Sequence, residues 1–480
     1  MHKRVGRFFC KVLLLAPLCA GIAAEEGKDL VVSIEWEAII LPPTANDNEQ
    51  QHRRFESFRE AVAGDSLQEA EITAKEMVEY TISGFNIDLP ARCRALHNLA
   101  LIQHLRGDFD SAIVNFRTAI DVMTSDTDRL NEALVMPLRG LGAVYADAGQ
   151  PVEAFHSFDR ALHISNVNEG PHSLVQLPIL DAILQLHLEQ DDVRVTLDVM
   201  HRIYLLHVRT YALDSMQLIP VLYKQAGVYR SFGMSAEERS ELGRVAKIMR
   251  QHHGSSDAML IDPYLQLGRN LADELDKMIF RSGPTAPTAE RYLKNALRIA
   301  EKNPEVGWLV RKKCLLALAD YYSLVEMYAR ANRYYQQTWV LLSSDDAYLA
   351  RRAEDLEVNV PLSRPRPHPY ANFEYNHDRD DINPDDYLRG EMTMRFTLTR
   401  QGRIKDVELV AADPPDFARM ERRMRNALKK FKYRPRYADG VAIEARQQQY
   451  TLNYQYLPSE YAASQAKEGK LGRPRPPQRQ

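Results

Sequence analysis

The chain of 480 residues lacks the features that define several large classes of protein. It has only four cysteines, which excludes a disulfide-rich scaffold. After the first thirty residues it contains no run of eighteen or more uncharged apolar residues, which excludes a polytopic membrane protein. With 45% hydrophobic and 26% charged residues, its composition is that of a globular protein, and its length allows two to four domains.

Motifs of common catalytic sites are also missing. The sequence has no His-Glu-x-x-His, no Gly-x-x-x-x-Gly-Lys-Ser/Thr and no Gly-x-Ser-x-Gly. The histidine pairs 252/253 and 201/207 lack cysteines or carboxylates at ligand spacing, so we interpret them as surface or core histidines. We therefore expect no catalytic residue, no metal, no cofactor and no small-molecule substrate, and the protein is predicted not to be an enzyme. No nucleic-acid recognition element is present either.

The N-terminus is typical of a secretory signal peptide. The first eleven residues contain four lysines and arginines and no acid, and residues 12–24 are uncharged and mostly apolar. We predict a cleaved signal peptide over residues 1–24 and an exported chain, with an uncleaved leader that anchors it to the inner membrane as the alternative. Of the cysteines that follow, Cys93 and Cys314, we expect both to be buried rather than bridged.

Charge divides the chain into two parts. The formal net charge is −3, but residues 387–480 hold twenty Lys and Arg against ten Asp and Glu, a net charge of +10. Residues 25–386 consequently carry −17. This asymmetry predicts at least two domains with different partners.

A repeated pattern precedes the basic part. In one stretch, small and large residues alternate at helical spacing around a tight turn: Leu138, Leu141, Gly142, Tyr145, Gly149, Pro151, Ala154, Phe158, Ala161 and Leu162. Related copies place their turns near positions 64, 107, 149, 190 and 233, which are 43, 42, 41 and 43 residues apart. The pattern resembles the tetratricopeptide repeat (TPR), and its long period resembles the kinesin light chain type. We predict a mainly α fold, with an α-solenoid of TPR-like helix pairs over residues 51–350 after an extended segment at 25–50.

Further helices are expected at 289–301 and 315–342, without a clear repeat register. The resemblance implies a concave groove that binds extended peptides or helices. Its groove-facing positions would be Arg94, His97, His104, Arg139, Tyr223 and Arg230. For each of them, an ordinary solvated side chain on a helix face remains the alternative interpretation.

A Pro-rich and acidic stretch, residues 351–386, separates this region from the C-terminus. Four prolines lie between 361 and 369, so residues 359–370 are expected to form an extended connector. The acidic cluster at 378–386 lacks the glycine and terminal glutamate of a calcium loop, so we interpret it as solvated linker.

Residues 387–457 predict a small α+β domain in the order strand, strand, helix, strand. Apolar residues alternate from Met392 to Leu398, a turn follows at Gln401-Gly402, and residues 407–411 close a hairpin. A helix with one apolar and one basic side comes next, and then a tyrosine-rich strand. Residues 458–480 are expected to form a disordered basic tail.

This order, together with Phe431-Lys432-Tyr433-Arg434-Pro435, Asp439-Gly440 and a tyrosine-rich last strand, resembles the C-terminal domain of TonB-type energy transducers. The resemblance implies a periplasmic location and capture of a segment of an outer-membrane transporter by strand addition. The pairing edge would be residues 446–456, including Tyr450 and Tyr454. Tyr433, Arg434 and Pro435 would set the turn that presents this edge, or would merely shape the fold.

The chain departs from that family because a helical solenoid stands where a transducer has a membrane helix and a long Pro-rich span. We therefore expect a periplasmic protein–protein interaction adaptor. Its groove would hold one protein, and its basic domain another, such as a TonB-dependent transporter or a motor complex. The alternative is a structural envelope protein that anchors to peptidoglycan or to an envelope assembly.

Overall fold

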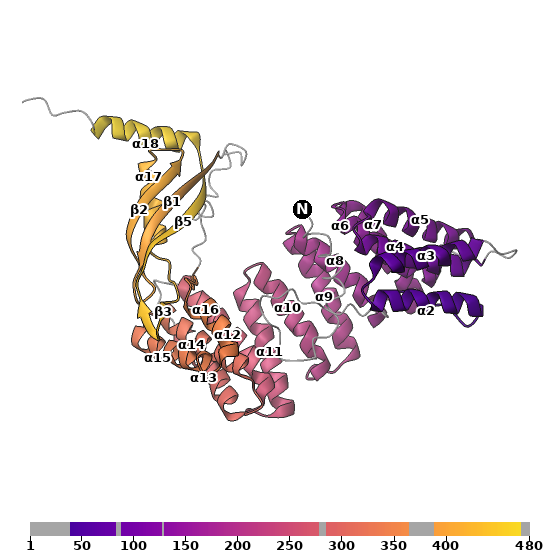
Figure 1. The fold of residues 1–480 in the computed structure, drawn as a ribbon, viewed down its shortest axis with the longest axis horizontal. Helices are drawn as coiled ribbons and strands as arrows, with labels where there is room; N and C mark the ends of the chain where they lie inside the picture. Colours follow the sequence, from indigo (N-terminus) through magenta and orange to yellow (C-terminus); the bar gives the residue numbers. More distant parts are fainter. Residues whose placement is uncertain (1–38, 83–87, 127–128, 278–284, 364–387, 472–480) are drawn as a thin grey trace, which may run out of the picture. The chain divides into compact units, whose positions relative to one another are not determined.

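The structure, a computed structural model, describes residues 39–82, 88–126, 129–277, 285–363 and 388–471 (Figure 1). It divides into two compact units, one ending at Ile248 and one beginning at Met249. The predicted signal peptide and residues 364–386 of the predicted linker lie outside the described residues. Within the described ranges, no helix has both the length and the hydropathy required to cross a membrane.

The first unit is a stack of helix pairs, which confirms the predicted α-solenoid. Within each pair two helices are joined by a short turn, and each pair packs on the next. The pairs are α2 (Glu49–Ala63) with α3 (Leu67–Ile82), α4 (Leu89–Leu105) with α5 (Phe109–Asp126), α6 (Val135–Asp147) with α7 (Pro151–Glu169), α8 (Leu177–Glu189) with α9 (Val193–Thr210), and α10 (Ile219–Ser231) with α11 (Ser235–His253).

The turns inside these pairs fall at the predicted positions. Gly107, Gly149 and Gly233 have φ values of 81°, 74° and 70°, a region that glycine enters without steric cost. In the two other turns the next residue, Asp65 or Asp191, adopts the positive φ instead. Aspartate tolerates this region better than most residues, so neither turn needs a glycine at the position with positive φ.

Close helix approach explains the small residues of the repeat. A Cβ atom on Gly142 would lie 2.6 Å from the ring of Phe158, and one on Gly140 would lie 2.4 Å from the ring of Phe116. Both rings are almost fully buried. The glycines therefore let the rings of the second helices pack directly on the α6 backbone.

A capped 3-10 turn, which the sequence analysis missed, leads into several first helices. Asn131, Ser173, Ser215 and Asp257 each accept a hydrogen bond from the N–H two residues later, and they lie 42 residues apart. Prolines at the starts of α8 and α10 follow the cap. A small polar residue with a proline five residues later is therefore a sequence signal for the start of this repeat.

The second unit begins with further helices. They are α12 (Ile261–Lys277), α13 (Thr285–Lys302), α14 (Trp308–Leu324), α15 (Tyr328–Leu342) and the short α16 (Leu349–Leu356). The stretch predicted as helical from 315 to 342 is interrupted between α14 and α15, where Glu326 has a φ of 61°. This turn repeats the arrangement of Asp65 and Asp191, so the register of the repeat continues to α15.

The remainder of the second unit is the C-terminal module, residues 388–471. Its sheet has the strand order β2-β1-β5, all antiparallel, from β1 (Leu388–Leu398), β2 (Ile404–Asp413) and β5 (Ala445–Tyr456). Helix α17 (Ala418–Leu428) buries Met420, Met424 and Leu428 against it. The predicted order is thus confirmed, with one unpredicted addition, the small hairpin of β3 (Arg436–Ala438) and β4 (Val441–Ile443).

Two predicted segments differ in the structure. Residues 458–471 form helix α18, so the prediction of a disordered tail is wrong there, and Tyr461 packs edge-on against Phe417 at 5.3 Å. The start of the predicted linker is likewise not a free connector. The N–H of Arg434 donates to the carbonyl of Val360 at 2.8 Å, and that of Leu362 donates to Lys432 at 2.9 Å.

Candidate binding sites

The N-terminal segment, residues 39–47, lies along helix α4. The side-chain amide of Asn98 donates to the carbonyl of Leu41 at 3.0 Å and accepts from its N–H at 2.8 Å. Nε2 of His97 lies 2.9 Å from the carbonyl of Ile39. Two neighbouring side chains of α4 thus contact the main chain of the segment, and His97 is only 2% exposed.

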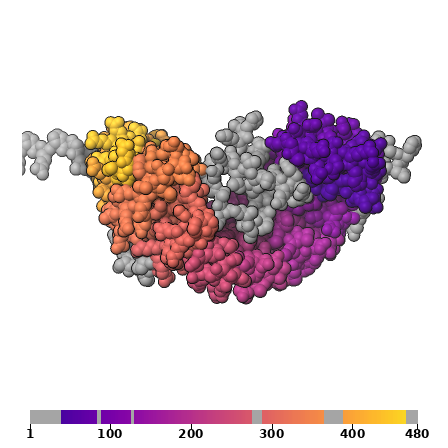
Figure 2. Space-filling view, turned by 60° about the horizontal axis from the view of Figure 1, so that its bottom comes forward, coloured from indigo at the N-terminus to yellow at the C-terminus, as the bar shows by residue number. Residues whose placement is uncertain are grey.

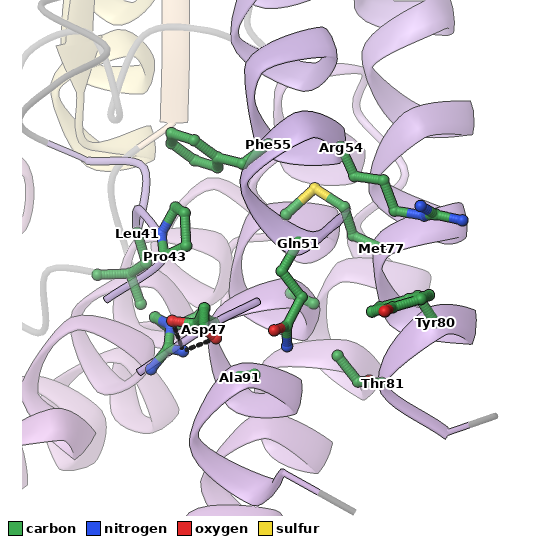
Figure 3. Close-up of a pocket in the computed structure, with 12 residues that line it drawn as sticks. Leu41, Pro43, Asp47, Gln51, Arg54, Phe55, Met77, Tyr80, Thr81 and Ala91 are labelled. Carbon is green, nitrogen blue, oxygen red and sulfur yellow. Dashed lines mark hydrogen bonds and ion pairs between the residues drawn. The ribbon is translucent and has the colours of Figure 1, made fainter. Parts of the chain in front are cut away.

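An ion pair fixes the far end of the segment. The guanidinium of Arg94 contacts both carboxylate oxygens of Asp47 at 2.6 Å, as the dashed lines in Figure 3 mark. Burial alone would raise the pKa of Asp47, but hydrogen bonds from Thr44 and the charge of Arg94 hold it below its usual value. The predicted groove residues Arg94 and His97 therefore meet a segment of the same chain.

A small hollow lies between the N-terminal segment and helices α2, α3 and α4 (Figure 3). Its lining includes Leu41, Pro43, Arg54 and Tyr80. A water-sized volume of about 30 Å³ is far below the several hundred Å³ of an ordinary ligand pocket. The hollow is therefore a packing defect beneath the segment rather than a small-molecule site.

The other predicted groove residues are separated from this site. His104 is buried and lies 2.8 Å from Asp147 of the next pair, so it joins neighbouring repeats. Arg230 pairs with Glu238 of α11 at 2.6 Å. Tyr223 is half-buried on α10. The six predicted residues thus do not form one cluster.

Arg139 belongs to a buried line of charges on α6, α8 and α10. Burial lowers its pKa to about 10, against the opposing charge of Asp181. Asp181 accepts from Nζ of Lys224 at 2.7 Å. Burial raises the pKa of Asp181, although Lys224 opposes the shift. Asn98, Asp181 and Lys224 were not predicted as site residues. All three stand nine residues before a repeat turn, so a polar residue recurring at that position was the available signal.

In the C-terminal module, Arg434 contacts the helices rather than solvent. Its Nε and Nη2 donate to the two carboxylate oxygens of Asp320 on α14 at 3.0 and 2.7 Å, and its Nη1 donates to the carbonyl of Asp355 at 2.9 Å. Burial alone would lower the pKa of Arg434, but the carboxylate of Asp320 raises the pKa of this guanidinium above its usual value. Tyr433 and Pro435 beside it are also buried. This turn therefore attaches the module to helices α14–α16, and does not expose a binding surface.

The β3–β4 hairpin extends the attachment. The hydroxyl of Tyr437 donates to Asn332 at 2.6 Å, and its ring lies against Tyr335 and Trp339 of α15. Tyr437 is 1% exposed. In the space-filling view, the orange and yellow module and the orange helices form one continuous surface (Figure 2).

Strand β5 lies at one edge of the sheet, as predicted for residues 446–456. Its partner β1 occupies one side, and among the described residues no strand pairs with the other side. Tyr454 points into the core and is 3% exposed, whereas Tyr450 is 38% exposed and packs on Phe431. Of these two predicted partner-binding tyrosines, only Tyr450 is accessible.

Other reactive groups form no site in the described ranges. No group of three or more His, Cys, Asp or Glu is placed to hold a metal ion there. Cys93 and Cys314 are free and buried, which confirms the prediction for both. Burial raises their thiol pKa values to about 11 and about 12.

Comparison with known proteins finds solved repeat structures with low similarity to this chain. No protein-family model and no curated protein matches the sequence. The TPR-like repeats of a putative kinesin light chain from Podosopora anserina are 15% identical, cover 42% of this chain and 97% of theirs, and give a TM-score of 0.39. A tetratricopeptide repeat protein from Parabacteroides merdae is 13% identical, covers 63% of this chain and 97% of its own, and gives a TM-score of 0.32. A Rap protein complexed with competence and sporulation factor is 12% identical, covers 67% of this chain and 92% of its own, and gives a TM-score of 0.31. Because these scores are low, the description of the repeats rests on the helix pairs themselves.

Proposed function

We propose that the protein is a periplasmic protein–protein interaction adaptor in TonB-linked envelope transport. The helical repeats hold one protein, and the C-terminal module captures a second by strand addition to β5. The sequence resemblance to TonB-type C-terminal domains supports the location and the transport context. The free edge of β5 is the observation that carries the binding mode.

The two edges of the sheet differ in how well they would accept another strand. Along β5, residues 448–456 pair with β1 without a register shift and include no charged residue or proline. Along β2, the pairing with β1 is interrupted twice, Asp406 has a φ of 53°, and charged residues recur. Bulges and charges are devices that protect an edge from pairing. Residues 448–456 of β5 lack these features and are the better template for β-augmentation.

Attachment of the module suits this role. Arg434 and the β3–β4 hairpin pack on the helices. A partner bound at β5 would therefore be connected to α14–α16 without a flexible linker at Arg434. An adaptor needs such a connection if one partner is to be held at a fixed distance from another.

Site-specific photo-cross-linking tests the proposal in envelope preparations. A benzoylphenylalanine replaces Asn453 on β5 in the full chain, and a matched control replaces Val410 on β2, where the side chain is also exposed. We expect Asn453 to cross-link a TonB-dependent transporter or a motor component, and Val410 to give no such product. Equal products from both positions would contradict strand addition at β5.

The second candidate function is anchoring to the cell wall. The exposed side of α17 and its end bears cations that have no ion pair among the described residues: Arg419, Arg422, Arg423, Lys429 and Lys430. Such a surface favours an anionic partner, with a strong dependence on salt. Sedimentation with purified peptidoglycan that disappears when these five residues are replaced by glutamine would favour this function over transport.

A further inference from the structure

The contacts that hold the N-terminal segment are of a kind that would hold another peptide equally well. Asn98 binds both main-chain polar groups of Leu41, and His97 binds the main-chain carbonyl of Ile39. Main-chain contacts fix an extended chain without reading its side chains. Among the side chains of the segment, those of Ile39 and Ile40 are buried, and the carboxylate of Asp47 pairs with Arg94.

The fit of the segment leaves polar groups unsatisfied. Nδ1 of His97 and Nε of Arg54 are buried and have no hydrogen-bond partner in the part of the chain that the structure describes. Arg54 lines the hollow under the segment. Unpaired buried groups cost free energy, so a peptide that supplied partners for these two atoms would bind better than the segment does.

We propose that the face of α4 bearing Arg94, His97 and Asn98 is a binding site for an extended peptide of another protein, and that residues 39–47 are a tethered occupant which such a peptide displaces. The partner segment carries an acidic residue six positions after the residue whose main chain Asn98 binds, with apolar residues before it. This inference rests on the proposed binding role of the helical repeats, and it assigns that role to one helix face and one peptide chemistry.

Tethering explains how the site would be controlled. A segment joined to α2 by a direct chain connection is present at a high effective concentration, which weakens any competing peptide. The apparent affinity for an external peptide is therefore the intrinsic affinity multiplied by the fraction of molecules in which the segment has left the α4 face. A partner with better contacts to Arg54 or His97 would overcome this competition.

The test uses the full chain and a fluorescent peptide with the sequence of residues 38–48. The double variant Ile40→Ser, Asp47→Ala weakens the tethered segment and leaves α4 intact. We expect fluorescence anisotropy to show binding to this variant that is about tenfold or more tighter than to the parent chain. Adding Asn98→Ala should abolish binding, and a peptide with lysine at the position of Asp47 should bind weakly because it faces Arg94.

Absence of peptide binding to a double variant with unchanged helical circular dichroism would overturn the inference. If the double variant does not fold, hydrogen exchange of the parent chain decides instead. The proposal predicts that the Leu41 amide exchanges at least tenfold faster than the core amides of α4. Equal protection of the Leu41 amide and the core amides of α4 would show that residues 39–47 are a permanent part of the fold, and would overturn the inference. Neither negative outcome affects cross-linking at β5, so failure here is distinguishable from failure of the adaptor function.

Discussion

The guanidinium of Arg434 and the carboxylate of Asp320 form a two-point ion pair, with N–O distances of 3.0 and 2.7 Å, between the C-terminal module and helix α14. The side chains are 10% and 21% exposed. An arginine fork on a carboxylate fixes orientation as well as distance. The residue predicted to present a binding edge thus serves to attach the module.

Removal of this pair should destabilise the second unit. In Arg434→Ala the carboxylate of Asp320 loses its charged partner while still largely buried and keeps, among the described residues, only the hydrogen bond from the hydroxyl of Tyr335, so we expect a loss of about 3 kcal/mol in the free energy of unfolding. Urea denaturation followed by circular dichroism measures it. Arg436→Ala, at an exposed neighbour on β3, is the matched control and should change stability little. Equal effects of the two variants would show that the ion pair does not attach the module.

Acid should weaken the first unit through His97. Burial lowers its pKa to about 4 from an unfolded value of 6.5, and the charge of Arg139 acts in the same direction. The unfolded chain therefore binds a proton that the folded chain rejects, so stability falls as the pH drops from about 6.5 to about 4, by about 3 kcal/mol. Below that range the contribution is constant. Denaturation across this pH range should show a shallower slope for His97→Gln, which retains a donor for Ile39. Superimposable profiles would contradict the assignment.

Close packing at α6 predicts opposite effects for two glycine substitutions. In Gly142→Ala the new Cβ meets the buried ring of Phe158, so we expect a destabilisation of about 1–3 kcal/mol. In Gly227→Ala, within α10, nothing lies within 4 Å of the new atom. Alanine is the better helix former, so this variant should gain up to about 1 kcal/mol. A change of the same sign in thermal denaturation of both variants would argue against the packing role of Gly142.

The two buried cysteines should be chemically silent in the folded chain. Both thiols are at most 2% exposed and have raised pKa values, which suppresses the reactive thiolate. Titration with a thiol reagent should therefore detect Cys93 and Cys314 only after denaturation. Rapid reaction of either thiol under native conditions would show that its surroundings open readily.

The helical repeats and the strand order could be predicted because each depends on local spacing. Residues such as Gly149 and Phe158 recur at intervals that the helix period imposes, and the alternation from Met392 to Leu398 follows from a single buried face. The turn near Gln190 has no glycine, but the surrounding apolar residues kept the period and made the turn predictable.

The binding sites were harder to predict because they depend on contacts between distant parts of the chain. Arg94 and His97 were named for facing a groove, but their contacts with Asp47 and Ile39 span 47 and 58 positions. The partner of Arg434 lies 114 positions away. Spacing along one helix cannot reveal such pairs, whereas the last strand, predicted as the pairing edge at residues 446–456, is an edge strand in the structure.

Hydrogen exchange of β5 in the full chain tests the central claim most directly. The probe is a synthetic peptide with the periplasmic coupling segment of a TonB-dependent transporter. We expect the amides of residues 448–456 on the free edge to become protected when the peptide is added, and those of β2, residues 404–413, to remain unchanged. Binding without new protection in β5, or protection of β2 instead, would contradict it.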